Sequence, residues 1–111
     1  MKTLADLTAP CEISHKILEK DVQAKCVNWA RSRQYWARKF SSQSQRSVPD
    51  YLFRGRGIDW FTEFKAPGKT STDAQKDEQN LMRAAGWRGF ECDNFELFKT
   101  TVLAMEKGEW R

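Results

Sequence analysis

Apolar residues recur along the chain with two periods, and these periods predict its secondary structure. Between residues 13 and 33, Leu18, Val22, Cys26 and Trp29 follow one another at steps of three or four residues. This spacing places them on one face of an α-helix, so we predict an amphipathic helix whose apolar stripe faces a core. The preceding residues have no clear period, and we expect an N-terminal arm over residues 1–12.

Shorter apolar runs separated by turn residues predict the remaining elements. The runs are rich in aromatic and β-branched residues, which favour strands, and Gly and Pro punctuate them. We predict a strand at 34–40, a polar loop at 41–47, strands at 50–53 and 58–66 around a turn at 54–57, a helix at 70–86, a strand at 87–93 and a helix at 94–108, whose apolar face carries Phe95, Phe98, Val102 and Met105. The order α-β-β-β-α-β-α indicates an α/β fold, a mixed sheet flanked by helices, in a single domain over residues 13–111.

Composition narrows the class of protein. A chain of 111 residues with five Trp and seven Phe can bury one core. Three cysteines without a CxxC pair and a single histidine argue against a disulfide scaffold or a zinc site, and they favour a reducing compartment, the cytoplasm. No apolar run approaches the ~20 residues that cross a bilayer, so we expect no membrane partner.

The net charge of +4 is unevenly distributed. Residues 31–58 contain seven Lys or Arg side chains and one acid, Asp50, interleaved with Tyr35, Trp36 and Phe40. Such a stretch suits a phosphate backbone, although a solvated basic loop would have the same charge pattern. Tyr35 and Trp36 could stack on unpaired bases or pack in the core.

Three charged residues interrupt the apolar runs. Because strand side chains alternate, Glu63 and Lys65 point to one face, and Asp50 lies on the neighbouring strand of the predicted hairpin. We expect Trp60, Thr62 and Phe64 to be buried on the other face, which leaves the face of Phe61, Glu63 and Lys65 polar. The alternative is a hairpin with solvated charges.

Two carboxylates and one ammonium at a single point suggest a metal site. The carboxylates would repel each other unless a hard cation with oxygen ligands, Mg²⁺ or Mn²⁺, lies between them. A metal beside a lysine suits phosphodiester hydrolysis, because the ion polarises the phosphate and acidifies a water while the lysine orients that water.

Four separated motifs resemble the VRR-NUC branch of the PD-(D/E)XK nucleases. They are "EKDVQAKCVNWARSR", "KFSSQSQRSVPDYLF", "WFTEFKAPGKTSTDAQ" and "MRAAGWRGFECDNFELF", and the resemblance covers roughly residues 18–105. It implies a restriction-endonuclease-like core. One departure is Ser47, where the family usually has glycine before Val-Pro-Asp.

The resemblance assigns roles to individual residues. Asp50 and Glu63 correspond to metal-binding acids, Lys65 to the catalytic lysine, and the backbone carbonyl of Phe64 to a further metal ligand. Glu19 matches an acid of the first helix that points into the site, although an acid near a helix start is also common on surfaces.

A glutamine of the following helix completes the implied site. Gln75 matches the family's position, and Gln79, one turn later, is the other candidate. Thr72 and Gln75 also have the spacing of a capping box, which would occupy the glutamine side chain at the helix start.

The implied function is that of a metal-dependent endodeoxyribonuclease acting, as a homodimer, on branched DNA such as Holliday junctions. The basic residues expected to flank the acidic site and contact DNA are Arg38, Lys39, Arg46, Arg54, Arg56 and Lys69. The alternatives are a nicking nuclease without structure selectivity, for example one encoded by a phage and acting in the host cytoplasm, or a non-catalytic nucleic-acid-binding module.

Overall fold

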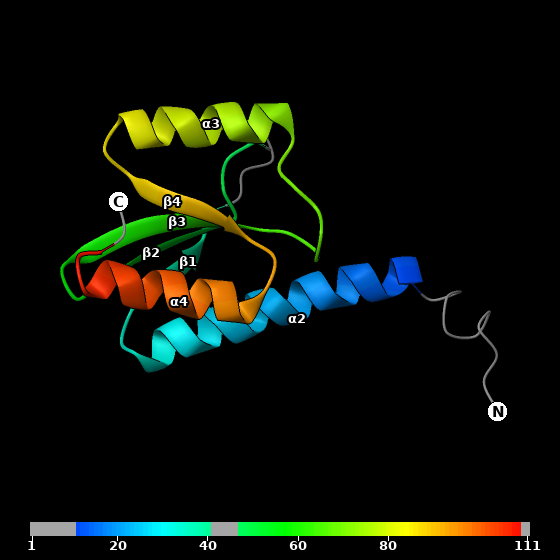
Figure 1. Cartoon of the computed structure of the whole chain (residues 1–111), viewed down its shortest axis with the longest axis horizontal. Helices are drawn as coiled ribbons and strands as arrows, with labels where there is room; N and C mark the ends of the chain where they lie inside the picture. The colour runs from blue at the N-terminus through cyan, green and yellow to red at the C-terminus, as the bar shows by residue number, and fades with distance from the viewer. Residues whose placement is uncertain (1–10, 41–46, 110–111) are drawn as a thin grey trace.

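The computed structural model describes residues 11–40 and 47–109 as three helices and four strands (Figure 1). The elements are α2 (Cys11–Ser32), β1 (Trp36–Lys39), β2 (Tyr51–Gly55), β3 (Ile58–Phe64), α3 (Asp73–Ala84), β4 (Arg88–Cys92) and α4 (Phe95–Glu106). The predicted order of elements is confirmed. Helix α2 begins at Cys11 and so includes the last two residues of the predicted arm. Strand β2 continues through Arg54 and Gly55 into the predicted turn. Arg46 lies outside the described residues.

The strands form one mixed sheet in the order β1-β2-β3-β4. The first three strands are antiparallel neighbours, whereas β4 runs parallel to β3. A parallel pair needs a crossover connection, and α3 supplies it. The first turn of α3 lies close to the end of β3, because Gln75 in that turn contacts Glu63 and also Lys65, the residue that follows the strand.

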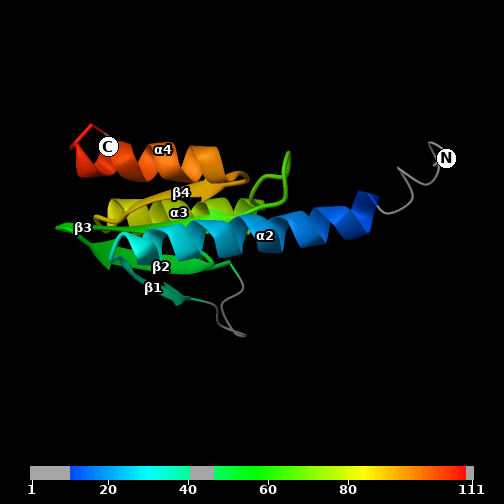
Figure 2. The ribbon, with the colours of Figure 1, turned by 90° about the horizontal axis from the view of Figure 1, so that it is seen from below.

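Helices cover both faces of the sheet. Helices α2 and α4 lie side by side against one face, and α3 lies over the other, here called the α3 face (Figures 1 and 2). The expectation of a polar face carrying Phe61 and Glu63 is therefore wrong: Phe61 is fully buried and Glu63 is only 4% exposed. The reason is that α3 packs over β3 and β4, with the Arg83 guanidinium 5.4 Å from the Phe61 ring centre.

The opposite face holds the main core, which is built from aromatic rings. The ring of Phe98, on α4, contacts five of them, on α2 and on three strands: those of Trp29, Phe53, Trp60, Phe64 and Phe90. Phe98, Val102 and Met105 are buried, and Phe95 packs against the same cluster, which confirms the predicted apolar face of α4.

Strand register arranges the side chains of the α3 face in rows across the sheet. One row contains Trp36, Arg54 and Asp59, which are paired positions on β1, β2 and β3. The next contains Arg38, Leu52, Phe61 and Gly89. At the far end, Asp50, just before β2, lies beside Glu63, which pairs with Glu91.

Gly89 is required by the packing of Phe61. A Cβ atom placed on Gly89 would lie 2.1 Å from two ring carbons of Phe61, which is fully buried and has little freedom to shift. We expect Gly89→Ala to lower the free energy of unfolding by about 1–3 kcal/mol, the usual cost of overpacking a core. Urea denaturation measures this change, and the companion change Phe61→Leu in the same variant should recover part of it.

Candidate metal and phosphodiester site

Asp50 is held at the entrance to β2 by contacts from two neighbouring strands. Its backbone carbonyl accepts a hydrogen bond from the N–H of Phe40 at 2.6 Å, and Pro49 before it is fully buried. Its Oδ2 accepts a hydrogen bond from the N–H of Phe64 at 2.8 Å. The carboxylate is therefore fixed against the last residue of β3, next to Glu63.

Glu63 is a buried carboxylate with one oxygen atom that has no hydrogen-bond partner. Burial, followed by the nearby charge of Asp50, raises its pKa to about 8, although the Lys65 ammonium opposes both effects. Its Oε1 atom is buried and makes no hydrogen bond within the structure, which is costly for a polar atom. Such an unsatisfied oxygen beside a second carboxylate suits a cation ligand better than a structural role.

Lys65 lies between Glu63 and helix α3. Its Nζ donates a hydrogen bond to Oε1 of Gln75 at 2.8 Å and lies 3.7 Å from Oε2 of Glu63. Only 16% of the lysine side chain is exposed, so its position is fixed by these contacts. The Gln75 amide also approaches Glu63, with Nε2 3.5 Å from Oε2.

The capping box and the contact with the site are both made by the same glutamine. Thr72 Oγ1 accepts from the N–H of Gln75 at 3.2 Å, and Gln75 Oε1 accepts from the N–H of Thr72 at 2.9 Å while it also binds Lys65. The two interpretations of Gln75 left open by the sequence are therefore compatible. This double use could not be read from residue spacing.

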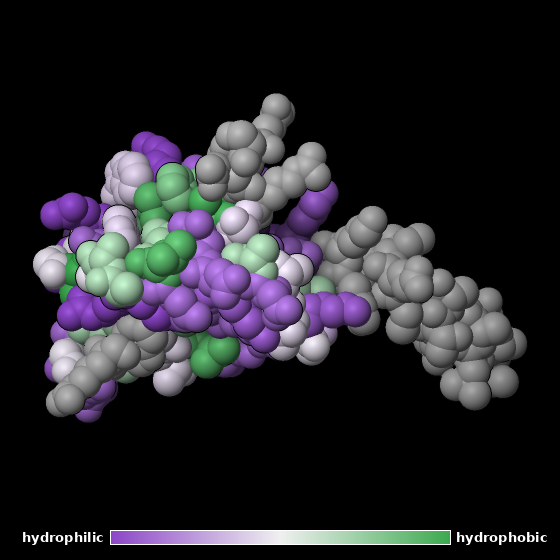
Figure 3. Space-filling model, turned by 90° about the horizontal axis from the view of Figure 1, so that it is seen from above, coloured by the Kyte–Doolittle hydropathy of each residue, from purple (hydrophilic) through white to green (hydrophobic). Residues whose placement is uncertain are grey.

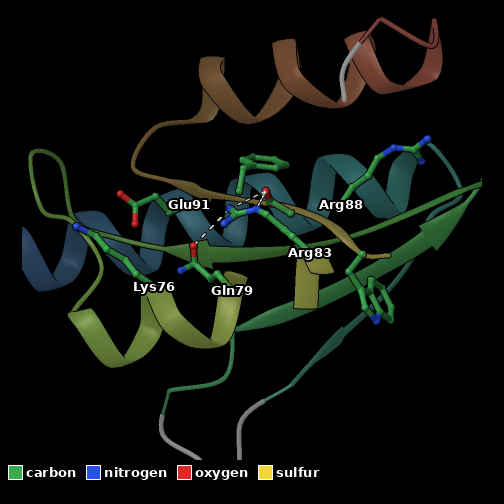
Figure 4. A pocket seen from close by; sticks show the side chains of 8 residues that line it. Lys76, Gln79, Arg83, Arg88 and Glu91 are labelled. Carbon is green, nitrogen blue, oxygen red and sulfur yellow. Dashed lines mark hydrogen bonds between the residues drawn. The ribbon is translucent and has the colours of Figure 1, made fainter. Parts of the chain in front are cut away.

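Gln79 faces a different part of the sheet. It donates to Ser71 Oγ at 3.0 Å and lies 3.5 Å from the Arg83 guanidinium, which in turn binds the carbonyl of Gly89 (Figure 4). Of the two glutamines, Gln75 is therefore the one in contact with Lys65 and Glu63. Ser71 also binds the Glu91 carboxylate through its N–H and hydroxyl, a partly buried polar contact that the sequence did not predict.

Glu19 contributes to the site through its charge. It lies on α2, half-buried, and its charge adds to the effects that raise the pKa of Glu63. Among residues 19–40 and 47–109, whose side chains the structure describes, no three acidic, cysteine or histidine side chains are grouped closely enough to hold a metal ion. The protein atoms that could share one are thus carboxylate oxygens of Asp50 and Glu63, with the backbone of Phe64 adjacent.

Comparison with solved structures identifies the fold. A structure described as a VRR_NUC domain matches with a TM-score of 0.70 and 26% sequence identity, over 78% of this chain and 95% of that chain. This match confirms the resemblance of the chain to the VRR-NUC family. No family model matches the chain, and neither does any curated protein. This VRR-NUC chain is accordingly a nuclease-like domain, with the mixed four-stranded sheet and flanking helices of that fold.

Three of the predicted DNA-contacting residues of this VRR-NUC domain lie toward the acidic end of the sheet. Lys39 ends β1 opposite Tyr51, one residue from Asp50, and is exposed. Lys69 is exposed and lines a small cavity that also contains Lys65. Arg38 is one position further along β1 and exposed. A DNA-binding role for these residues stays a prediction.

Arg54 and Arg56 do not flank the acidic site. Asp50 precedes β2, whereas Arg54 is near the end of this strand and Arg56 is in the following turn, so they are about 13 Å and 20 Å further along the hairpin at ~3.3 Å per residue. Arg54 lies 4.0 Å from Asp59, and Arg56 donates to the carbonyl of Arg33. The error arose because the turn lies at one end of the hairpin, whereas Asp50 and Glu63 lie at the other end. Their predicted contact with DNA is untested.

Among the described residues, none of the helices is both long and apolar enough to cross a membrane. Cys26 and Cys92 are buried free thiols.

Proposed function

We propose that this VRR-NUC domain is a metal-dependent endodeoxyribonuclease that hydrolyses phosphodiester bonds in branched DNA, such as Holliday junctions. The observation that carries the proposal is the buried carboxylate of Glu63, which has an unsatisfied oxygen and lies between Asp50 and Lys65. A surface hairpin with solvated charges would not bury a carboxylate beside another and leave one of its oxygen atoms without a partner.

Asp50, Glu63 and the carbonyl of Phe64 would hold one Mg²⁺ or Mn²⁺ ion. When bound, the ion supplies polarisation of the scissile phosphate and a more acidic water. The N–H of Phe64 keeps the Asp50 carboxylate turned toward this point. Glu19 adds negative charge from α2, which increases the attraction of the site for a cation.

Lys65 places an ammonium beside the position of the scissile phosphate. In that position it orients the attacking water and offsets the negative charge that accumulates on phosphorus in the transition state. Gln75 holds the ammonium in place through a 2.8 Å hydrogen bond. Gln75 is thus a positioning residue for Lys65, and the lysine is the group that meets the substrate.

A homodimer would suit a branched substrate. Two copies related by a two-fold axis would present two sites, and a four-way junction offers two equivalent strands for paired cuts. The residues available to contact the backbone include Arg38, Lys39 and Lys69, which are exposed. We place this activity in the cytoplasm, where the buried thiols of Cys26 and Cys92 would remain reduced.

Cleavage assays on different DNA shapes test the proposal. The purified protein is incubated with a four-way junction, a linear duplex of the same sequence and a supercoiled plasmid, in Mg²⁺, in Mn²⁺ and in EDTA. We expect cuts in the junction with either metal and none in EDTA. Binding without cleavage in both metals would refute the enzymatic function, whereas equal cleavage of junction and duplex would favour a nicking enzyme without structure selectivity.

Lys65→Ala should reduce the rate of cleavage by about 10²-fold or more while leaving the fold intact. The reason is that it removes the ammonium that offsets the negative charge on the phosphate in the transition state. The rate is measured under single-turnover conditions at saturating protein. Lys107→Ala is the matched control, since Lys107 is an exposed lysine that follows α4, and it should cleave at the rate of the unmodified chain. An unchanged rate for Lys65→Ala would refute the assignment of the site.

A further inference from the structure

A hollow lies on the α3 face, at the end of the sheet opposite the acidic site. It has a volume of about 460 Å³ and is lined by Trp36, Leu52, Phe53, Arg54 and Trp87. Helix α3 packs against β4, and Trp36 on the edge strand β1 remains 49% exposed. Seen from above, apolar side chains lie among hydrophilic ones on this side of the molecule (Figure 3).

Trp36 is the notable residue of this hollow. An indole ring is large and apolar, and burial is the usual way for a protein to stabilise one. The neighbouring Tyr35, whose side chain points to the other face, is 3% exposed and stacks edge-on against Trp60. The sequence left open whether these two aromatics pack in the core, and the structure divides them: Tyr35 packs in the core and Trp36 does not.

Arginine side chains surround the exposed indole. The Arg38 guanidinium lies 5.4 Å from the centre of the Trp36 ring, and Arg54 pairs with Trp36 across β1 and β2. The Arg54 side chain is 78% exposed and lies 4.0 Å from the Asp59 carboxylate. A hollow lined by two tryptophans and by Arg54, with Arg38 beside Trp36, offers stacking surfaces and a positive field together, which is the combination that binds single-stranded nucleic acid.

The position of the hollow relative to the acidic site supports the same ligand. Both lie on the α3 face, and β2 connects them directly, from Asp50 at one end to Arg54 at the other. The two positions are about 13 Å apart along the strand. A nucleic-acid strand held at the acidic site and following the uncovered side of the sheet would pass Arg38 and reach Trp36.

We propose that this hollow is a base-binding subsite, in which an unpaired nucleobase stacks on Trp36 while Arg38 and Arg54 contact its backbone. The proposal rests on the proposed function in one respect, that the base belongs to the strand that is cut. Branched DNA presents unpaired bases in flaps and forks, and in four-way junctions where base pairs at the centre open, so the subsite would give the nuclease a means to prefer such DNA over a continuous duplex.

Charge distinguishes this ligand from a second copy of the chain. In a two-fold interface the same surface meets itself, so the arginines around Trp36 would face the same arginines of the other copy. Such a contact between like charges is unfavourable, whereas a phosphate backbone neutralises them. The hollow therefore suits a nucleic acid better than self-association.

Binding of three fluorescent DNAs tests the subsite in the Lys65→Ala background, where cleavage does not interfere. The DNAs are a single strand, a fully paired duplex and a single strand with abasic residues in place of bases. Trp36→Ala should weaken the binding of the normal single strand about tenfold, as expected for the loss of one stacked base, and that of the other two less than about twofold. Trp36→Phe, which keeps a ring, should recover most of the affinity.

Leu81→Ala is the matched control, because Leu81 is an exposed apolar residue of α3 that does not line the hollow, and it should bind all three DNAs normally. Equal weakening on all three DNAs, or no change on any, would overturn the stacking proposal. A change in sedimentation by Trp36→Ala with unchanged DNA binding would instead assign the hollow to a second copy. These results do not depend on cleavage: a protein that stacks bases but cuts no DNA would refute the proposed nuclease and leave the subsite standing.

Discussion

Glu63→Gln should reduce metal-dependent cleavage by about 10³-fold or more and, at the same time, raise the stability of the metal-free protein above pH 5. The loss of activity follows because an amide keeps the shape of the side chain but removes the charge that would hold the ion. The gain in stability follows because the same charge is unfavourable in the folded, metal-free chain, where Glu63 is buried beside Asp50.

The direction of the pH dependence comes from the pKa of Glu63. Burial, followed by the charge of Asp50, raises this pKa from 4.5 to about 8 in the folded state. Between these two values the folded protein keeps a proton that the unfolded chain releases. This group therefore stabilises the fold fully below about pH 4.5, and that contribution is lost as the pH rises through about 8.

Thermal unfolding in EDTA measures the effect. Glu63→Gln should melt at the same temperature as the unmodified chain near pH 4.5 and about 4 °C or more above it at pH 8, since ~1 kcal/mol shifts the melting temperature of a small domain by several degrees. Added Mg²⁺ should raise the melting temperature of the unmodified chain only. Glu96→Gln, which changes an exposed acid of α4, is the control and should melt like the unmodified chain at both pH values and gain the same stability from Mg²⁺. A destabilised Glu63→Gln at pH 8 would contradict this view of the site.

Phe98→Ala should cost about 3–5 kcal/mol of unfolding free energy, a large fraction of the total stability of a domain of this size. Phe98 is fully buried, and its ring lies 5.4–6.2 Å from the ring centres of five other aromatic residues. Its removal leaves a cavity at the point where α2, α4 and the sheet meet, and aromatic rings cannot collapse readily to fill it.

The adjacent residue provides the control for this measurement. Leu97 is on the same helix but 43% exposed, so Leu97→Ala should cost less than about 1 kcal/mol. Both variants are compared by urea denaturation, with the slope of the transition checked for equality. Similar losses for the two would mean that α4 contributes through its helical backbone rather than through the ring of Phe98.

Local patterns were sufficient to predict the elements and the approach of Asp50 to Glu63. Helical periodicity placed Phe98, Val102 and Met105 on the buried face of α4, and a two-residue spacing placed Lys65, the residue after β3, on the same side as Glu63. The proline and glycine residues that bound the strands then indicated which two strands form the hairpin. These signals are all short in range, and each rests on one steric or hydrophobic preference.

Contacts between distant parts of the chain could not be predicted in this way. The burial of Phe61 and Glu63 depends on where α3 packs, which no pattern within β3 records. Likewise, Glu106 accepts hydrogen bonds from Arg33 at 3.2 Å and from the Tyr35 hydroxyl at 2.6 Å, across more than 70 residues. The sequence does not show whether a charged residue of a helix, such as Glu106, faces solvent or binds distant partners.

The capping box of α3 has a consequence for which amino acids position 75 can accept. Glutamate and glutamine serve equally well at the third position of a helix start, because either one can accept the N-cap N–H. Here only the amide satisfies both neighbours, since its oxygen faces the Lys65 ammonium and its nitrogen faces the Glu63 carboxylate. A glutamate would start the helix equally well but would add a third negative charge beside Asp50 and Glu63. Glutamate and glutamine are therefore equivalent at position 75 for starting the helix, but only glutamine suits the contacts with Lys65 and Glu63.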